Sequence, residues 1–298
     1  MTFTRTKSGL KNYSRFFNVD ITVFAEGKNC LAEQNKKFGT SVETSDELFH
    51  HTILNIFSPN HLYKIKSVGS KTNVDTYAKK IRDGDIRNCL LIYDSDYESV
   101  ITSWVAPAWA MRTYGYSWEN DFWTAKICES VIDILSGGRT WNKSAFHQTF
   151  LLAEKRITDL SRVEVFCRVN GINLIIPKNK SLGVRISSGC AALISASEAK
   201  RLIEVVKSQL RSVDDALRLE IRSLLRPLIS TQLVRGHLWE AICISLIVRT
   251  LKKIQIDSAL PTDLIRNVAL GLFKENPLHY LEKTAQTHYS KQQKQAGL

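Results

Sequence analysis

The chain has 298 residues, 44% of them hydrophobic, and a net charge of +12, which suits one large domain or two ordinary ones with packed cores. Six cysteines without a CxxC pair argue against a zinc site or a disulfide framework and favour a cytoplasmic protein with reduced thiols. The first ten residues are polar and the apolar stretch 238–251 is too short to span a bilayer, so we expect no signal peptide and no membrane association.

The first predicted strand is the apolar run Ile21 to Phe24, which leads directly into Glu26. A continuous apolar run that ends at a glycine turn is typical of a strand buried on both faces of a parallel α/β sheet. Residues 44–57 then predict a helix with Ser45 as its N-cap. Residues 62–68 alternate polar and apolar side chains and predict a second strand.

A third predicted strand, residues 88–93, follows a helix expected over Asn73 to Arg82 and ends in Asp94-Ser95-Asp96. Strand, helix, strand, helix, strand at these spacings predicts parallel strands joined by right-handed crossovers. The carboxyl ends of such strands are where open α/β sheets bind ligands. Glu26 and the two aspartates would therefore crowd together, which is costly unless a cation lies between them, and a divalent metal ion is the obvious candidate.

Residues 104–123 are rich in aromatic side chains. Such side chains pack in cores or interfaces more often than they stack on bases, and both interpretations remain open here. A short strand-like piece, Arg112 to Tyr116, precedes Glu119 in this region. Glu119 is therefore either a first-turn helix residue favoured by the helix dipole or a fourth carboxylate of the site.

The second half of the chain is predicted to be mostly helical, apart from one β-hairpin. A helix is expected from Lys143 to Asp159. Residues 163–176 alternate apolar and polar side chains on both sides of Asn170-Gly171, which is typical of a hairpin turn. Apolar residues beyond about residue 195 recur at steps of three and four, as in amphipathic helices, whereas the last dozen residues are polar and expected to fray.

The two expected domains, residues 1–145 and 146–298, differ in charge. Residues 1–150 carry 18 Lys and Arg against 16 Asp and Glu, whereas residues 151–298 carry 23 against 13. A basic half beside an acidic site suggests that one part holds a polyanion while the other acts on it. Four arginines share one face of a predicted helix, where they either bind nucleic acid or keep that face solvated: Arg211, Arg218, Arg222 and Arg226.

Three short motifs resemble the TOPRIM domain, the metal-binding α/β module of topoisomerases, primases and OLD-family nucleases. They are AEGK and DSD after hydrophobic strands and GSK before a helix. The later WEND and RGHLWEAI elements, the hairpin and the basic helical tail are similar to one OLD-like subgroup, the nuclease effectors of PARIS anti-phage defence. The resemblance extends over most of the chain and implies a TOPRIM-like parallel sheet flanked by helices, then a β-hairpin and a mostly helical C-terminal region.

The same resemblance implies a nuclease that depends on Mg²⁺ or Mn²⁺ and is held inactive by an ABC-type ATPase subunit. It further implies release, as a homodimer, when a phage inhibitor is sensed, and cleavage of host tRNA, which arrests translation. One departure from the family pattern is Cys30, where an acidic residue is usual. A thiol is a poor ligand for a hard cation, which argues against a second metal site supplied from this position.

The residues themselves suit this chemistry. Phosphodiester cleavage needs neutralised charge at phosphorus and an activated attacking oxygen, and a metal ion supplies both. We expect Asp94 and Asp96 to face one ion, with Glu26 as a further ligand or as the proton acceptor. Lys28 and Lys71 lie in turns beside the strand ends, where they either steady a phosphate or are ordinary turn lysines.

Two other functions remain open at the level of sequence. The first is a DNA endonuclease of OLD type, since phosphate contacts look alike in DNA and RNA. The second is a sensor or adaptor whose carboxylates are structural, although the complete set of Glu26, Asp94 and Asp96 argues against it. His237 is either a site or interface residue or, as is more common for a histidine at a helix start, a structural one.

Overall fold

The computed structural model describes residues 13–27, 43–97, 107, 109–169, 193–209, 215–256 and 260–298. The chain divides into two compact units. Unit 1 comprises Met1–Asp94, Val105–Thr113 and Glu282–Leu298, and unit 2 comprises Ser95–Trp104 and Tyr114–Leu281. The chain therefore returns twice to unit 1 after leaving it, so the units are not two consecutive segments.

Unit 1 contains a four-stranded, all-parallel sheet with the strand order β2-β1-β3-β4, flanked by helices, so the predicted α/β class is confirmed. Phe24 and Leu91, in the two central strands, are fully buried, as expected where both faces of a sheet are covered. The elements of unit 1 are α2 (Tyr13–Phe17), β1 (Ile21–Ala25), α3 (Ser45–Phe57), β2 (Tyr63–Ser67), α4 (Lys71–Arg82), β3 (Cys89–Tyr93), β4 (Ala110–Arg112) and α15 (Lys283–Gln295).

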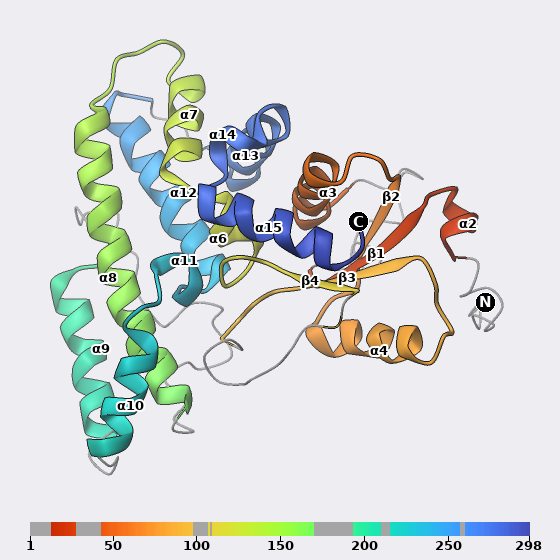
Figure 1. Ribbon diagram of the computed structural model, residues 1–298. Helices are drawn as coiled ribbons and strands as arrows, with labels where there is room; N and C mark the ends of the chain where they lie inside the picture. The colour runs from red at the N-terminus through yellow and green to blue at the C-terminus, as the bar shows by residue number, and fades with distance from the viewer. Residues whose placement is uncertain are drawn as a thin grey trace, which may run out of the picture. The chain divides into compact units, whose positions relative to one another are not determined.

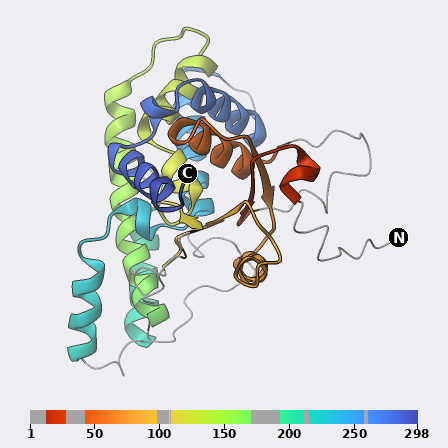
Figure 2. The same ribbon diagram turned by 45° about the vertical axis from the view of Figure 1, so that its right-hand side comes forward.

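The strand order places β1 and β3 side by side with connections that leave in opposite directions. The chain runs from β1 through α3 to β2 on one side, and then from β2 through α4 back across β1 to β3. Because parallel crossovers are right-handed, helices on such opposed connections cover opposite faces, and α3 and α4 do so (Figures 1 and 2). The carboxyl ends of β1 and β3 thus form a topological switch point, the place where open α/β sheets bind ligands.

The helix α15 belongs to unit 1, although its polar sequence predicted a frayed end. Tyr289 and Gln293 are buried, and the Tyr289 ring meets that of Phe49 in α3 at a centroid distance of 6.3 Å. The side-chain oxygen of Gln292 accepts a hydrogen bond from the backbone N–H of Arg112 in the edge strand β4, at 2.6 Å. The expectation was wrong because a few spaced side chains suffice to order a polar helix that covers a sheet edge.

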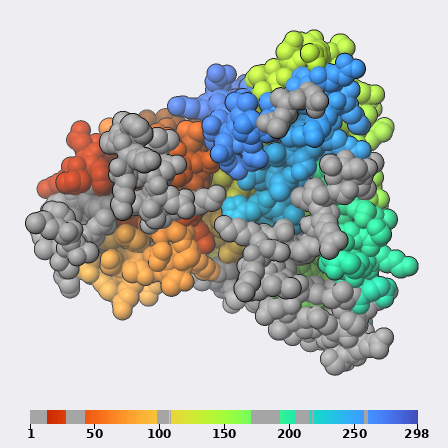
Figure 3. Space-filling model, turned by 180° about the vertical axis from the view of Figure 1, so that it is seen from behind, coloured from red at the N-terminus to blue at the C-terminus, as the bar shows by residue number. Residues whose placement is uncertain are grey.

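Unit 2 is helical in its described residues, and α12 contacts α6, α7 and α8. The indole N–H of Trp239 in α12 donates to the carbonyl of Trp123 at 2.8 Å. Figure 3 shows α12 and α13 at the surface beside α7. Within the described ranges, none of the helices combines the length and the apolar content that a membrane span requires. The elements are α6 (Trp118–Phe122), α7 (Ala125–Leu135), α8 (Lys143–Val169), α9 (Ala196–Gln209), α10 (Asp215–Leu225), α11 (Ser230–Leu233), α12 (Gly236–Lys253), α13 (Thr262–Glu275) and α14 (Pro277–Tyr280).

The first strand of the predicted β-hairpin is wrong, because residues 163–169 form the last turns of α8. The helix predicted to end at Asp159 therefore continues to the end of that segment. Val165 lies in one buried cluster with Leu225 of α10, and this packing on a helix face outweighs the β-propensity of the valines. Residues 170–176, which hold the predicted turn and second strand, lie outside the described residues.

The strand expected at Arg112 to Tyr116 lies earlier in the chain, as β4. β4 ends at Arg112. Beyond it, the backbone N–H groups of Tyr114 and Gly115 donate to the carboxylate of Asp121, at 3.0 and 2.7 Å, instead of to a neighbouring strand. The helix α4 begins two residues earlier than predicted, with Ser70 as its N-cap. This earlier start places the first N–H groups of α4 next to the carboxyl ends of the strands.

Candidate active site

Unit 1 brings three of the predicted site residues to the carboxyl edge of its sheet. Glu26 follows β1, Asp94 follows β3, and Lys71 opens α4 after β2. Since β1 pairs in parallel with both β2 and β3, these residues follow three neighbouring strands. Glu26 and Asp94 are half-buried and lie at the switch point of the sheet.

Glu26 is held by the N-terminus of α4. Its Oε1 accepts a hydrogen bond from the backbone N–H of Lys71, the first residue of that helix, at 3.0 Å. First-turn N–H groups have no partner within their own helix, and the helix dipole favours an anion at this end. The backbone N–H of Glu26 also donates to Ile92 of β3 at 2.9 Å. The carboxylate is therefore fixed in place and its negative charge is stabilised.

A carboxylate that the sequence did not single out, Asp46, lies beside Glu26-Gly27 in unit 1. Asp46 is buried in the first turn of α3, and the hydroxyl of Ser67 donates to its Oδ2 at 2.7 Å. Gly27 passes so close that a Cβ built on it would lie 1.7 Å from the same oxygen. Burial raises the pKa of Asp46. An acidic residue in a first helical turn is common, so the sequence carried no signal that separates Asp46 from an ordinary helix-start residue.

Asp96 belongs to unit 2 and has a left-handed backbone with a φ of 44°. Its backbone N–H donates to the carbonyl of Tyr116 at 2.8 Å, and the Tyr116 hydroxyl bonds to the Asp96 carboxylate. Burial, and then the charge of Asp96, raise the pKa of Tyr116, so this hydroxyl stays protonated. Left-handed backbone is uncommon outside glycine and clusters at functional sites. Tyr116 thus holds Asp96 in a defined position within unit 2.

The WEND and RGH motifs, far apart in the sequence, meet in unit 2. Nδ1 of His237 lies 2.9 Å from Oε1 of Glu119, and the two side chains are 54% and 5% exposed, respectively. The hydroxyl of Ser117 donates to the other Glu119 oxygen at 2.5 Å. Burial alone would raise the pKa of Glu119, but the bonds from His237 and Ser117 outweigh it and the pKa lies below its usual value. A buried, ionised carboxylate therefore orients a largely exposed imidazole.

The other polar residues of the WEND motif are structural. The side-chain amide of Asn120 donates to the carbonyl of Val234 at 2.8 Å, just before α12 begins. Asp121 accepts the two backbone bonds from the loop before α6 that were described above. Both side chains are buried, and buried polar groups persist only when they are bonded in this way. The bond from Asn120 to Val234 thus holds α6, which contains Glu119, against the start of α12, which contains His237.

Gly236 permits this arrangement because it has no side chain. A Cβ built on it would lie 1.9 Å from the Ser117 hydroxyl and 2.5 Å from a Glu119 oxygen. We expect Gly236→Ala to lower the free energy of unfolding by about 1–3 kcal/mol, since the methyl group overpacks a buried site. Urea denaturation measures the change. Gly271→Ala in α13 is the matched control, because nothing lies within 4 Å of its Cβ position; equal losses in both variants would contradict the prediction.

A second buried carboxylate in unit 2, Glu164 of α8, links the residue after Asp96 to the start of α12. Glu164 pairs with Arg235, the N-cap residue of α12, and with Arg168 at 3.2 Å. The hydroxyl of Tyr97 donates to its other oxygen at 3.3 Å. Burial raises the pKa of Glu164 to about 7, although the Arg235 charge opposes the rise.

The raised pKa of Glu164 predicts that stability falls with rising pH. A glutamate in the unfolded chain loses its proton near pH 4.5, whereas the folded protein keeps the proton up to about pH 7. This contribution is therefore fully present below the unfolded pKa and is lost as the pH rises through the folded one, with a slope of at most about 1.4 kcal/mol per pH unit. Urea denaturation between about pH 4.5 and pH 8 should show this slope in the wild type but not in Glu164→Gln. Parallel profiles of stability against pH for the two proteins would contradict this prediction.

Three predicted positions lie outside the described residues: Lys28, Cys30 and Arg211. Of Arg218 only its place in α10 is described. Arg222 in α10 and Arg226 just after it are exposed, whereas Ile221 and Leu225 are buried, so the last two positions of the predicted amphipathic stripe are confirmed. In the aromatic-rich segment, the described Trp118, Phe122 and Trp123 are all buried, so packing is the correct interpretation for these three.

Mg²⁺ takes oxygen ligands, and the predicted ligands Glu26, Asp94 and Asp96 are all carboxylates. Among the described residues, no three or more His, Cys, Asp and Glu side chains are grouped closely enough to hold a metal ion. Mg²⁺ keeps several waters, however, and is usually bound through roughly one or two carboxylates plus substrate phosphates. Glu26 and Asp94 at the switch point suit that mode of binding.

Each unit thus has candidate site residues of its own. Unit 1 contains Glu26, Asp94 and Lys71, and unit 2 contains Asp96 and the Glu119–His237 pair.

No protein-family model matches the chain, and no curated protein is significantly similar to it.

Proposed function

We propose that the chain is a Mg²⁺-dependent endonuclease, a TOPRIM nuclease of OLD type similar to the effector AriB of PARIS anti-phage defence. The observation that supports this best is the position of Glu26 and Asp94 at the topological switch point of a parallel sheet. Phosphodiester hydrolysis needs anionic ligands for a cation beside groups that bind phosphate, and helix N-termini bind phosphate well. The N-terminus of α4 lies at this same edge.

In this proposal Glu26 and Asp94 of unit 1 hold the divalent ion together with the substrate phosphates, with Mn²⁺ as a substitute for Mg²⁺. When bound, the ion supplies charge neutralisation at phosphorus and a lowered pKa for the attacking oxygen. Lys71, and Lys28 with it, contact the phosphate groups that flank the scissile bond and balance the charge that develops there. Glu26 is pre-oriented for its role by the Lys71 N–H.

We further assign a proton-transfer role to His237, with Glu119 as its positioning residue. A carboxylate that accepts from Nδ1 selects the tautomer in which Nε2 exchanges protons, as in other carboxylate–histidine pairs. The imidazole is exposed and can therefore reach a bound substrate, while the buried Glu119 carboxylate fixes the orientation of the ring. His237 would protonate the leaving oxygen or accept a proton from the nucleophile.

The proposed substrate is RNA, and specifically host tRNA. The segment 151–298 carries 23 Lys and Arg against 13 Asp and Glu, which favours a polyanion. The exposed Arg222 and Arg226, together with Arg211 and Arg218, would grip the phosphate backbone, because the planar guanidinium both pairs with phosphate and stacks on bases. An active nuclease of this kind harms its own cell. An ABC-type ATPase subunit would therefore restrain it, and release would yield the active homodimer.

Incubation with total tRNA and with supercoiled plasmid, each in Mg²⁺ or in EDTA, tests the proposal. We expect tRNA fragments in the reaction with Mg²⁺ but not in the one with EDTA. The plasmid should stay intact in both. Nicked or linear plasmid with intact tRNA would favour the DNA endonuclease instead. If neither substrate is cut and expression of the chain without an ATPase partner is harmless, the chain is better described as a sensor or adaptor.

A further inference from the structure

Four segments of unit 2 that lie far apart in the sequence meet beside the first turn of α12. The backbone N–H of Tyr116 donates to the carbonyl of Thr231 at 2.7 Å, and the ring of Tyr116 meets that of Tyr97 edge-on at a centroid distance of 4.8 Å. Tyr97 also lies in one buried cluster with Val165 of α8 and with Leu233, which precedes α12. The segments that contain these residues are therefore held together by direct contacts.

Arg235 joins this cluster to the start of α12 through polar contacts. Its guanidinium pairs with Glu164 of α8 and bonds to the hydroxyl of Tyr97. The same hydroxyl donates to the other oxygen of Glu164 at 3.3 Å, so the three side chains form a closed set. The side chains of Arg235 and Glu164 are only 17% and 1% exposed. A buried ion pair contributes little net stability, because desolvation offsets the attraction, and its best-supported use is to specify one arrangement of the chain.

The backbone of Arg235 transmits this fixed position to His237. The carbonyl of Arg235 accepts the first hydrogen bonds of α12, from the N–H groups of Leu238 at 3.0 Å and Trp239 at 2.9 Å. His237 lies in that first turn, two residues after Arg235. Arg235 therefore determines where the backbone of His237 lies, whereas Glu119 determines how its ring is oriented.

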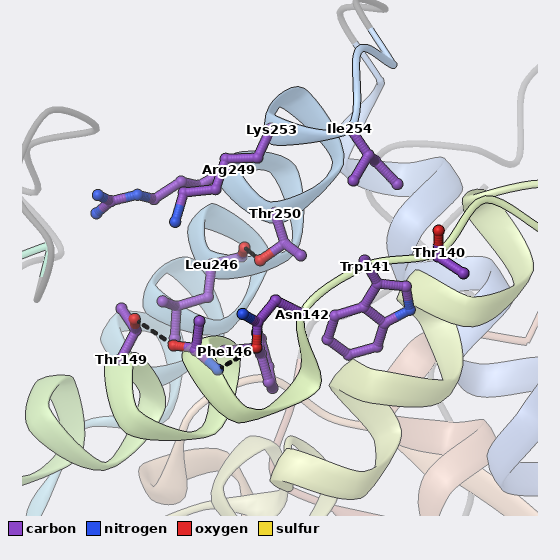
Figure 4. Close-up of a pocket in the computed structure, with 11 residues that line it drawn as sticks. Thr140, Trp141, Asn142, Phe146, Thr149, Leu246, Arg249, Thr250, Lys253 and Ile254 are labelled. Carbon is purple, nitrogen blue, oxygen red and sulfur yellow. Dashed lines mark hydrogen bonds between the residues drawn. The ribbon is translucent and has the colours of Figure 1, made fainter.

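The opposite end of the α8–α12 pair is joined less closely. The two helices run in opposite directions, and a pocket of about 520 Å³ lies between the first turns of α8 and the C-terminal half of α12 (Figure 4). Groups that face each other across a pocket lose their direct contacts, so this end does little to align the helices. Direct contacts are made by Phe150 with Trp239, at a ring-centroid distance of 5.3 Å, and by Glu164 with Arg235. These contacts orient the first turn of α12 against α8.

We infer that Arg235 is a positioning residue of the proposed reaction, which holds His237 in the place where it transfers the proton, with Glu164 and Tyr97 as its partners. The inference rests on the proposed nuclease function and deepens it, because it names what fixes the proton-transfer group. A displacement of a reacting group by about 1 Å, caused by a distant substitution, can cost about a hundredfold in rate. The alternative is a role in stability alone.

Single-turnover cleavage of total tRNA by the full chain in Mg²⁺, at about pH 8 and thus above the pKa of Glu164, tests the inference. Arg235→Gln is expected to lower the rate by about 10- to 100-fold and to leave the Kd for tRNA, measured in EDTA, within about twofold of the wild type. Arg266→Gln is the matched control. Arg266 is 21% exposed and pairs at 2.7 Å with Glu240 of α12, which is 12% exposed, so this variant also opens an ion pair on α12. It should cleave within about twofold of the wild-type rate.

A second measurement separates positioning from stability. In a chain that already carries His237→Gln, Arg235→Gln should cause a further loss of less than about twofold, because a residue that acts through His237 has nothing left to position. Losses that multiply in the double variant would overturn the inference, and so would equal losses in Arg235→Gln and Arg266→Gln.

Arg235→Lys covers the case in which Arg235→Gln fails to fold, as judged by circular dichroism. It keeps a positive charge beside Glu164 but lacks the planar guanidinium that also bonds to Tyr97, and it should cleave about 3- to 10-fold more slowly than the wild type. A folded Arg235→Lys that cleaves at the wild-type rate would refute the positioning role.

A readout without cleavage distinguishes failure of this inference from failure of the proposed function. The NMR chemical shifts of the ring nitrogens of His237, assigned with His237→Gln, report its bond to Glu119. They should change in Arg235→Gln and stay the same in Arg266→Gln, while those of His147 stay the same in both. If the wild type cuts neither tRNA nor plasmid but the His237 shifts respond in this way, the positioning holds and the nuclease does not. If the wild type cuts tRNA while the two variants have equal rates and equal His237 shifts, the nuclease holds and the positioning is refuted.

Discussion

Replacing Glu26 with glutamine is expected to slow RNA cleavage by about a hundred- to ten-thousandfold, the effect of several kcal/mol of lost charge stabilisation by the ion that Glu26 helps to hold. Glutamine keeps an oxygen that accepts the Lys71 N–H, so the fold should survive. The lost charge at the start of α4 costs about 0.3–1 kcal/mol, which is a small shift in thermal unfolding. Single-turnover cleavage rates and melting curves on the same protein measure both effects.

Asp83→Asn is the matched control for this variant. Asp83 is an exposed carboxylate at the C-cap of the same helix, so the charge change is identical but lies at the opposite end of α4. We expect it to cleave at the wild-type rate. Asp94→Asn should behave like Glu26→Gln, because both residues follow the strands that meet at the switch point. Wild-type cleavage by Glu26→Gln would remove this edge of the sheet from the mechanism.

Glu119→Gln is expected to lower cleavage by about a hundred- to ten-thousandfold, the usual worth of a positioned proton-transfer group. The glutamine amide would donate to Nδ1 of His237 and so favour the wrong tautomer of the imidazole. Because the Glu119 pKa is lowered, its carboxylate stays ionised at neutral pH in the wild type. His237→Gln should lower the rate to a similar extent, because it removes the imidazole that transfers the proton.

The chain offers a close control for this pair in Glu129 and His147. Nδ1 of His147 lies 2.7 Å from a Glu129 oxygen, and its side chain is 54% exposed, the same as that of His237, but its carboxylate is 24% exposed rather than buried. Glu129→Gln should leave the rate unchanged. Equal losses in the two glutamine variants would mean that the Glu119 effect is one of general stability and not of proton transfer.

The edge of the sheet with Glu26, Asp94 and Lys71 could be predicted because it depends on local patterns. Apolar runs that end in a carboxylate give the strands, and intervening helices force those strands to be parallel. Parallel strands then place their carboxyl ends together, whatever the details of packing. Asp46 escaped prediction because nothing in the sequence around it shows that Gly27 passes directly over its carboxylate.

The features that the sequence did not reveal, the Glu119–His237 pair and the full length of α8, depend on contacts between distant segments. WEND and RGH could be recognised as motifs, but a pattern within each does not reveal that Glu119 bonds to His237. Val163 to Val169 alternate like a strand, yet α8 continues through them because α10 offers a helix-shaped partner surface. In α8, tertiary packing therefore overrides a local β-preference that is worth only about 1 kcal/mol.

The return of α15 to unit 1 sets an order of events during synthesis. The strand β1 is made first, but the helix that covers β4 emerges only after all of Tyr114–Leu281. At roughly 5–20 residues per second, this interval lasts on the order of ten seconds or more on the ribosome. Throughout that time the edge of the sheet lacks the bond from Arg112 to Gln292 and the packing of Tyr289 on Phe49. Growing or prematurely released chains therefore carry Glu26 and Asp94 in an unfinished unit, and the part of the molecule that begins the chain is the last to be completed.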